Sequence, residues 1–558
     1  MNKPGMWAGA LVGALLTAPL IAVFYLASQL AGLPFAPFDV FDAANRVLPG
    51  SVITFGIETM VSVIRGLQLG ETSSAAKTAE QLMAVAGLFV TGIIAGAVLF
   101  AVLRGRDIKS GYLPGLILGA VIGVPVAIIS SVVNQSATAN PLVGQAWILL
   151  AFLVWGAALN WAYNDLAETA PAGQTVDTEP VSPASRIEPQ PASVTQMDRR
   201  QFIIRLGSSA AVITVVGAGL GALVGTDKAQ AEVAVDGGGA APGPTAWSAS
   251  NPLPNANAAV QPAPGTRAEF TPVQRHYRID INAAPPNIDE ASWRLRFSGL
   301  VNNPAELTLD NLRNNYEPIH QFVTLACISN PIGGDLIGTQ RWTGVPLKRV
   351  LADVGLQDGA TYLKITAADG FDEYVALDDI NADERIMLTY AWDGLPPTSG
   401  HGFPLRIYIP NHYGMKQPKW ITDIEAVSQW EEGYWVRRSW DKDAIMRATS
   451  VIDTVAVDNL VQNGDTTLVP IGGIAHAGDR GISKVEVQVD GGPWVEAQLR
   501  DPISQTTWVI WRYDWPFQEG NHTFTVRCYE GSGTPQIEAI AGAHPSGATG
   551  LHSTRETL

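Results

Sequence analysis

The stretch Gln321-Phe322-Val323-Thr324-Leu325-Ala326-Cys327-Ile328-Ser329-Asn330 decides how this chain folds. Its apolar run from residue 321 predicts a strand that becomes buried toward Cys327. A turn and a glycine-rich loop with Gly333 and Gly334 follow. A thiol at such a strand end is well placed to meet a metal or a substrate. The alternative is a small buried hydrophobic residue, which is what a free cysteine usually is.

The composition limits the chemistry available to the chain. It has two cysteines in 558 residues and a formal net charge of −16. Two thiols exclude a disulfide framework, a cysteine-rich zinc site and an iron–sulfur cluster held by cysteines of this chain alone. The negative charge argues against nucleic acid as a partner. Hydrophobic residues make up 47% of the chain, and their excess lies near the N-terminus, where it indicates membrane segments.

Strands and short helices surround Cys327 in the sequence. Residues 293–297 alternate like a strand, and residues 307–314 and 346–354 have helical patterns. We therefore expect an α+β domain over residues 267–450.

Five blocks of sequence carry a resemblance to a known family. They are Cys327-Ile328-Ser329-Asn330 with Gly333, Gly334 and Gly338; Trp342-Thr343-Gly344-Val345-Pro346-Leu347; Ala368-Asp369-Gly370-Phe371; His401-Gly402-Phe403-Pro404-Leu405-Arg406; and Tyr413-Gly414-Met415-Lys416-Gln417-Pro418-Lys419-Trp420. In this order and spacing, the set resembles the sulfite oxidase family of molybdopterin-dependent oxidoreductases, in a bacterial, exported and membrane-anchored form. The resemblance implies a multidomain chain with N-terminal transmembrane helices, an α+β molybdopterin domain and an immunoglobulin-like β-sandwich.

The resemblance also implies a molybdenum–molybdopterin cofactor whose metal is held by the Cys327 thiolate. A soft thiolate suits such a metal centre, and the pterin phosphate needs fixed donors and positive charge. The cofactor-binding residues implied are Asn330, Asp369, His401, Arg406, Lys416 and Lys419. Each has an ordinary alternative, as a solvated cation, a structural histidine or a turn residue.

Three departures from sulfite oxidases concern the substrate. The arginine that lies five positions after the metal-binding cysteine in those enzymes is replaced here by Ile332. A second anion-binding arginine aligns with Asp280, with Arg278 nearby, and the pocket tyrosine aligns with Trp440. Because a sulfite dianion needs concentrated positive charge, we expect another small substrate. The candidates for the wall of the catalytic pocket are Trp440, Tyr434 and Trp342.

From residue 451 the chain has short alternating segments separated by turn signals, over residues 481–492, 507–511 and 522–527. This pattern predicts a β-sandwich over residues 451–546, followed by a tail over 547–558. It resembles the immunoglobulin-like domain of the family, which often mediates dimers, so a homodimer is among the expected partners. Cys528 ends a strand and is expected in the core.

The first 165 residues are expected to form a transmembrane region. Apolar segments over 6–32, 82–104, 112–134 and 143–163 are each long enough to cross a bilayer of about 30 Å. Charged residues interrupt the stretch 34–70, which we interpret as interfacial or extramembrane. The pairs Gly9/Gly13 and Gly92/Gly96 and the series Gly115/Gly119/Gly123 predict close helix packing.

A different signal follows at Asp198-Arg199-Arg200-Gln201-Phe202-Ile203. It resembles a twin-arginine export signal and precedes an apolar run, so residues 199–225 are either that signal or an ordinary fifth transmembrane helix. Ala229-Gln230-Ala231 has the form of a cleavage site, and retention as an anchor is the alternative. Residues 166–198 and 226–266 are expected to be flexible linkers because they are rich in proline or in glycine and alanine.

The distribution of charge predicts the topology. Basic residues at Lys3, at 104–109 and at 199–205 all fall in the cytoplasm if five helices cross the membrane from a cytoplasmic N-terminus. The chain is then a multi-pass protein of the cytoplasmic membrane with its catalytic domain outside. All eight histidines lie from His276 onward and no C-x-x-C-H motif occurs, so we expect no haem in this chain.

These features predict a membrane-tethered molybdenum oxidoreductase that performs two-electron oxo transfer and exchanges electrons with a separate partner. One alternative is a structural or binding subunit that keeps the fold without turnover. Another makes the membrane region a quinone-linked redox module, which its lack of histidine disfavours.

Overall fold

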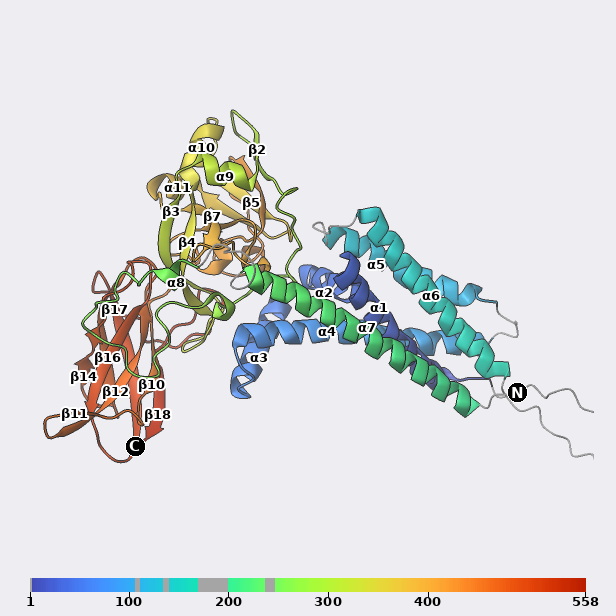
Figure 1. The fold of residues 1–558 in the computed structure, drawn as a ribbon, viewed down its shortest axis with the longest axis horizontal. Coiled ribbons are helices and arrows are strands. Elements are labelled where there is room, and N and C mark those ends of the chain that lie inside the picture. Colours follow the sequence, from blue (N-terminus) through green and yellow to red (C-terminus); the bar gives the residue numbers. More distant parts are fainter. Residues whose placement is uncertain (1–2, 106–110, 134–139, 169–198, 236–245) are drawn as a thin grey trace, which may run out of the picture. The chain divides into compact units, whose positions relative to one another are not determined.

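The computed structural model describes residues 3–105, 111–133, 140–168, 199–235 and 246–558 (Figure 1). The chain divides into two compact units. One comprises Met1–Arg46 and Glu80–Gln230, and the other comprises Val47–Ala79 and Ala231–Leu558. The expected linker 166–198 lies outside the described residues from position 169 onward.

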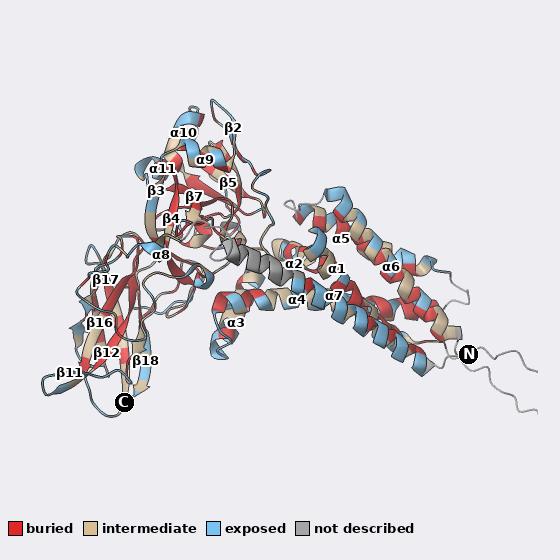
Figure 2. Cartoon of the chain, viewed as in Figure 1, coloured by how far each residue is buried: buried red, intermediate tan, exposed pale blue. Residues whose placement is uncertain are grey.

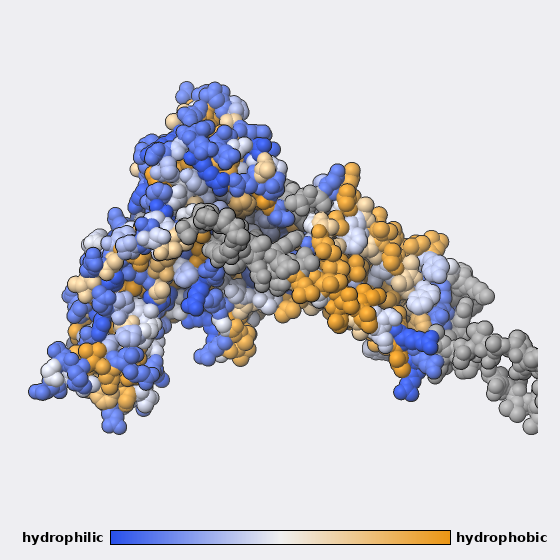
Figure 3. All heavy atoms as spheres, in the orientation of Figure 1, coloured by the Kyte–Doolittle hydropathy of each residue, from blue (hydrophilic) through white to orange (hydrophobic). Residues whose placement is uncertain are grey.

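The first unit is helical, and its apolar side chains cover much of its outer surface (Figure 3). Five helices in the described residues are long and apolar enough to cross a membrane, and only 22–33% of the most apolar window of each is buried. They are α1 (Met6–Ala31), α4 (Thr72–Arg104), α5 (Leu113–Val133), α6 (Pro141–Glu168) and α7 (Arg199–Val235). Apolar surface of this kind suits contact with lipid. The five expected segments are therefore confirmed by length and composition.

The stretch 34–70 forms two helices, α2 (Ala36–Val47) and α3 (Gly50–Gly66). They are bent by 120° relative to each other and would count as a sixth span only if taken together. The first residues of α4, up to Ala79, belong with α3 to the second unit.

Glycines bring the membrane helices close together. A Cβ at Gly9 would collide with the backbone oxygen of Gly96, and one at Gly115 with that of Gly156. Beside the first contact, the indole nitrogen of Trp155 donates to Thr17 Oγ1 at 3.2 Å. The close packing predicted at Gly9, Gly96 and Gly115 is confirmed.

Two sheets make up the α+β domain of the second unit. One has the order β2-β1-β9-β5-β6 and the other β3-β4-β7-β8. Helices α9 (Leu309–Asn315), α10 (Leu347–Val354) and α11 (Leu377–Ala382) share a buried core with the first sheet. The strands are β1 (Leu295–Gly299), β2 (Ala305–Leu307), β3 (Ile319–Ala326), β4 (Ile337–Pro346), β5 (Tyr362–Ala367), β6 (Asp372–Ala376), β7 (Met387–Trp392), β8 (Arg406–Tyr408) and β9 (Ile421–Val427).

The second sheet positions the chemistry. Strands β3 and β4 pair antiparallel from Ile319↔Gly344 to Ala326↔Ile337. The last four residues of β3 are buried, as the apolar run predicted. Cys327 therefore lies at the start of the loop that joins the edge strand β3 to β4, and the ladder between these two strands fixes the backbone on both sides of the loop.

The C-terminal region contains two antiparallel sheets that share one core (Figure 2). One holds β10 (Thr449–Val455), β11 (Val461–Asn463), β12 (Thr466–His476), β15 (Gln498–Leu499) and β16 (Val509–Pro516). The other holds β13 (Ile482–Val489), β14 (Trp494–Glu496), β17 (Asn521–Glu530) and β18 (His552–Thr557). Cys528 is fully buried between them, and both cysteines are free. The immunoglobulin-like assignment stays a prediction.

Two expected boundaries were wrong. Residues 246–266, expected in a linker, are bound to the β-sandwich, because the buried guanidinium of Arg500 donates to the carbonyl oxygens of Asn255 and Val260 at 2.9 and 2.8 Å. The expected tail contains β18, which pairs with β17 from Asn521↔Thr557 to Val526↔His552. Linker-like composition did not reveal partners that lie far away in the sequence.

Candidate functional site

The loop after β3 holds the thiol in a defined geometry. Cys327 is 8% exposed, and its Sγ lies 3.0 Å from Ser329 Oγ. Its backbone N–H donates to the oxygen of Leu336 at 2.9 Å. Asn330 closes the loop, since its Oδ1 accepts from the N–H of Leu336 at 3.0 Å and its own N–H donates to the oxygen of Cys327 at 3.1 Å. Burial raises the pKa of the Cys327 thiol, so an ionised sulfur there needs a positive partner such as a metal.

Aromatic side chains belong to the same buried cluster as this thiol. Trp342 and Trp440 share one buried cluster with Cys327, and both are at most 5% exposed. Trp342 packs at 4.9 Å from Trp392, between ring centroids. Tyr434 lies instead in a small separate cluster and has the guanidinium of Arg438 3.6 Å above its ring. Of the three pocket candidates, the two tryptophans therefore lie with the thiol, and Tyr434 does not.

Arg406 is the central cation of the site. It begins β8 and is 4% exposed, with its guanidinium 4.6 Å from the ring centre of Trp342. Its Nη1 donates to the oxygen of His401 at 2.9 Å, whereas its Nε has no hydrogen-bond partner. Burial lowers the pKa of Arg406 to about 10. A buried cation with an unused donor is suited to receive an anion.

Lys419 lies in the same region and is paired with Asp280. Its Nζ is 3.2 Å from Asp280 Oδ2 and donates to the oxygen of Gly400 at 3.0 Å. Arg278 Nε binds the same carboxylate oxygen at 2.9 Å, and Lys77 Nζ lies 3.0 Å from Oδ1. Burial lowers the pKa of Lys419 to about 7, even though Asp280 raises it. Burial opposes ionisation of Asp280, but the surrounding cations hold its pKa well below the usual range.

The remaining predicted residues make contacts within the protein. His401 uses both ring nitrogens, Nδ1 with Thr398 Oγ1 at 2.7 Å and Nε2 with the oxygen of His276 at 3.1 Å. Lys416 forms a buried ion pair of 2.6 Å with Glu373, away from the Asp280 cluster. Asp369 Oδ1 accepts from the N–H of Phe371 at 3.0 Å in a turn. These contacts match the ordinary alternatives of a structural histidine and a turn residue, and Lys416 is not a free surface cation.

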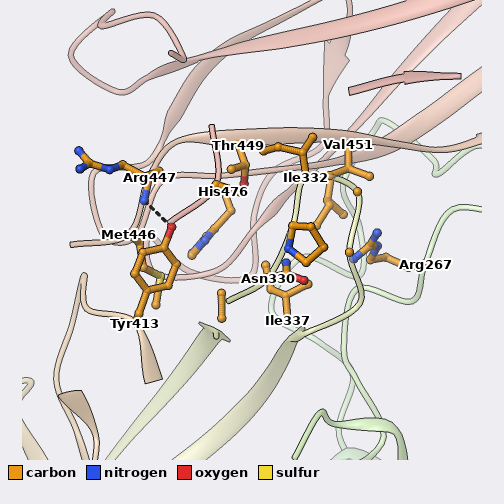
Figure 4. Close-up of a pocket in the computed structure, with 16 residues that line it drawn as sticks. Arg267, Asn330, Ile332, Ile337, Tyr413, Met446, Arg447, Thr449, Val451 and His476 are labelled. Atoms are coloured by element: carbon orange, nitrogen blue, oxygen red, sulfur yellow. Dashed lines mark hydrogen bonds between the residues drawn. The ribbon is translucent and has the colours of Figure 1, made fainter. Parts of the chain in front are cut away.

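A separate pocket lies beside the Cys327 loop (Figure 4). Its cavity of about 30 Å³ has room for about two water molecules. Ile332 and Tyr413 line it, as do several residues that the sequence did not single out: Arg267, Met446, Arg447 and His476. These four come from distant segments, and no local motif marks them.

One of the two arginines that line this pocket is paired with a carboxylate. Arg267 forms a bidentate pair with Asp453, with a shortest distance of 2.6 Å. Burial lowers the pKa of His476 to about 4, which keeps the ring neutral near pH 7, and its Nε2 has no hydrogen-bond partner. The backbone N–H of Arg447 donates to Tyr413 Oη at 3.0 Å, and its Nε donates to the oxygen of Ser546 at 3.2 Å.

Comparisons with known proteins agree on one domain. Residues 282–435 match the family described as the oxidoreductase molybdopterin binding domain. Nitrate reductase [NAD(P)H] of Hordeum vulgare is 26% identical over 335 residues, which cover 49% of this chain and 37% of that protein. Mitochondrial sulfite oxidase of Mus musculus is 27% identical over 272 residues, 41% of this chain and 50% of that protein. The chain thus spans half or less of the length of these relatives.

A solved structure is also similar. The sulfane dehydrogenase SoxCD from Paracoccus pantotrophus contains a chain that is 18% identical, with a TM-score of 0.45. The match covers 54% of this chain and 88% of that one.

The described residues fit a molybdenum–molybdopterin cofactor. They contain no cluster of three or more His, Cys, Asp or Glu side chains that would hold a metal alone, so the single thiolate of Cys327 requires that the cofactor supply further ligands. Arg406 Nε and Arg278 Nη2 are buried without partners, and an anionic phosphate would satisfy them. Residues 282–435 therefore form an oxidoreductase molybdopterin-binding domain, and this part of the chain is similar to sulfite oxidases and nitrate reductases.

Proposed function

We propose that this protein is a membrane-tethered oxidoreductase that acts on a small substrate other than sulfite, on the outer side of the cytoplasmic membrane. The chemistry that a bound molybdenum cofactor supplies is two-electron oxygen-atom transfer. Electrons pass to or from a separate carrier, because no histidine occurs before His276 to hold a haem in the membrane helices.

One observation carries the proposal: a constrained thiol lies in the same domain as Arg406, a buried cation with no carboxylate partner among the ion pairs of the described residues. The Cys327 thiolate would hold the metal end of the cofactor, and the two hydrogen bonds of Asn330 constrain its loop. Arg406 and Lys419 would hold the phosphate end, and their low exposure strengthens both interactions by limiting the access of water. Trp342 and Trp440 belong to the same buried cluster as the thiol, which limits the access of water to it.

The charge balance of the pocket supports a substrate other than sulfite. Ile332 occupies the wall where sulfite oxidases have an arginine. Arg267 is neutralised by Asp453, and the ring of His476 is neutral near pH 7. Among the described residues, Arg447 is then the remaining cation of the lining, so a dianion would find less positive charge there than a pair of free arginines supplies. A neutral polar substrate such as a sulfoxide or an N-oxide suits these walls better, because His476 Nε2 is an unused polar atom.

Contacts between helix ends support the proposed topology. Lys3 Nζ lies 3.4 Å from the oxygen of Arg104, so the start of α1 and the end of α4 share one side. Trp161 of α6 packs at 5.4 Å from Phe202 of α7, so the basic start of α7 lies near the end of α6. Both fit five crossings with the basic clusters in the cytoplasm. The start of α4 then lies outside, as does the domain that Lys77 contacts through Asp280.

Purification of the full chain from a host that makes the cofactor tests the proposal. Near-stoichiometric molybdenum by elemental analysis is expected, together with turnover of a sulfoxide or an N-oxide that exceeds turnover of sulfite. Molybdenum well below stoichiometry would refute an enzymatic role and favour a structural subunit. Preferential turnover of sulfite would refute the substrate class but leave the cofactor intact. Labelling of an introduced surface cysteine in intact cells would locate the domain.

A further inference from the structure

Lys77 is a buried lysine from a part of the chain that the molybdopterin-domain family does not cover. It lies in α4, and it is 6% exposed. Its Nζ donates to the oxygens of Asp280 and Asn282, at 2.9 Å each, and lies 3.0 Å from Asp280 Oδ1. Two hydrogen bonds and an ion pair thus hold Lys77 against residues 280–282. Burial of a lysine at this depth is rare unless it is paired.

Lys77 makes one of several contacts between residues 47–79 and the cofactor domain. The first N–H of helix α4, at Thr72, donates to Asp335 Oδ2 at 2.8 Å. A carboxylate at a helix N-terminus is favourable, and Asp335 belongs to the loop that follows Cys327. At the start of α3, a Cβ on Gly50 would lie 2.8 Å from the Cα of Arg438. The segment therefore contacts the cofactor domain at three places that are far apart in sequence.

The contact at Asp280 differs from the others because it is electrostatic. Asp280 is the carboxylate partner of Lys77, Arg278 and Lys419 among the ion pairs of the described residues. A buried acid with three cations leaves the cluster with excess positive charge, which Arg406 increases. Such a cluster is stable only when an anion is bound or when protons are lost. Lys77 thus contributes to the attraction for an anion without facing it.

We propose that residues 47–79 are a structural part of the cofactor domain, and that Lys77 is a positioning residue that fixes Asp280 and, through it, Lys419 and Arg278 for the cofactor phosphate. This inference rests on the proposed function. It means that the cofactor site is completed by a segment that includes the first turns of α4, itself a candidate membrane helix, more than 200 residues before Asp280. A domain expressed from residue 246 onward would lack one of its cations.

The test uses the full-length protein with its molybdenum and released pterin measured per chain. Lys77→Met is expected to reduce cofactor retention about tenfold when cofactor is limiting, the effect of losing one charge-assisted hydrogen bond. Lys77→Arg retains the charge and is expected to restore most of the retention. Arg65→Met is the matched control: it removes a cation from the same segment, where Arg65 makes only a long contact of 3.5 Å to the oxygen of Gly333. We expect retention near that of the unmodified chain.

A double-mutant cycle separates positioning from general loss of structure. Lys77→Met in the otherwise unmodified chain is expected to lower cofactor retention about tenfold. If Lys77 acts through Asp280, the same substitution in the Asp280→Asn variant changes retention by less than about twofold. The cycle remains informative if Lys77→Met alone fails to accumulate, because the Asp280→Asn background removes the carboxylate that Lys77 balances. Equal losses in both backgrounds, or retention unaffected by Lys77→Met, would overturn the inference. Absence of molybdenum from the unmodified chain would instead overturn the proposed function.

Discussion

Two polar regions of the second unit differ in how their charges are balanced. Around Asp280, buried cations outnumber the carboxylate, and Arg406 keeps an unpartnered nitrogen. In the pocket beside Ile332, Arg267 is neutralised by Asp453 and the ring of His476 is uncharged. The first region is suited to an anion that stays bound, and the second to a ligand with little charge that comes and goes. We propose that the first region holds the cofactor and the second the substrate.

The largest effect is expected at the Cys327 thiol. Cys327→Ala should lower activity by more than about 100-fold. Mutation of a residue that only hydrogen-bonds to a metal ligand already lowers metal affinity or activity about 10–100-fold, and Cys327 is the expected ligand itself. Activity with the preferred substrate and molybdenum per chain are the measurements.

Cys528→Ala is the matched control, since Cys528 is also a buried thiol but lies in the core of the β-sandwich. It should cost about 1 kcal/mol of stability and leave molybdenum unchanged. Equal activity losses in the two variants would remove the distinction between a ligand and a core residue.

A second change addresses the region with excess positive charge. Arg406→Gln removes a buried cation, and we expect cofactor retention to fall about tenfold when cofactor is limiting, as for the loss of a hydrogen bond to a charged group. Arg296→Gln is the control, because Arg296 forms an exposed pair with Asp423. Such surface pairs contribute little. Unchanged retention in Arg406→Gln would show that the region does not hold the phosphate.

A third change would make the second region resemble the first. Ile332→Arg adds positive charge to the pocket wall, and the KM for sulfite is expected to fall about tenfold, the value of one charge-assisted contact. The KM for a neutral sulfoxide should not fall. Ile332→Met provides a control for side-chain size. A sulfite KM that does not respond to the arginine would mean that this wall does not face the substrate.

The smallest effect is a dependence of stability on pH. The pKa of Lys419 is lowered by burial from 10.5 to about 7. Between these values the unfolded chain keeps a proton that the folded, cofactor-free chain has lost, so stability rises with pH across this window. The titratable and charged groups that interact with Lys419 are Asp280, Arg278, Arg406, Lys77, His401, His276 and Cys327.

Thermal unfolding of the cofactor-free protein in detergent, at pH 7 and pH 9, measures this dependence. Lys419→Met should make the slope smaller, and bound cofactor should also reduce it because a phosphate favours the charged lysine. If stability changes with pH to the same extent in the Lys419→Met variant and the unmodified chain, the pH dependence does not arise from a lowered pKa of Lys419.

Local patterns were sufficient to predict much of the fold. The apolar run ending at Cys327 predicted β3 and the loop after it, and the helical periods near residues 309 and 347 predicted α9 and α10. Arg406 and Lys419 were found through their motif blocks, and the structure brings them into one region. These features are set by neighbours in sequence, which a pattern records.

Other residues of the site depend on partners that are distant in the chain. Lys77 lies in no motif, and its role is indicated only by its ion pair with Asp280. Arg267 lies just after a stretch of linker-like composition, yet Asp453 fixes it at the pocket. Lys416 belongs to the same motif block as Lys419, but it forms a separate buried ion pair with Glu373. Ion pairs of this kind leave no periodicity in either segment, so only the fold reveals them.

Strand β18 has a consequence for the order in which the protein matures. His552, its first residue, accepts a hydrogen bond on Nδ1 from the N–H of Ile452 at 3.1 Å, and its ring lies against Gly333 of the Cys327 loop. Gly333 has φ of +72°, and a side chain there would collide with the imidazole. The contact between the loop and His552 therefore becomes available only after the C-terminal strand has been synthesised. A chain shortened before residue 552 would leave this side of the Cys327 loop uncovered.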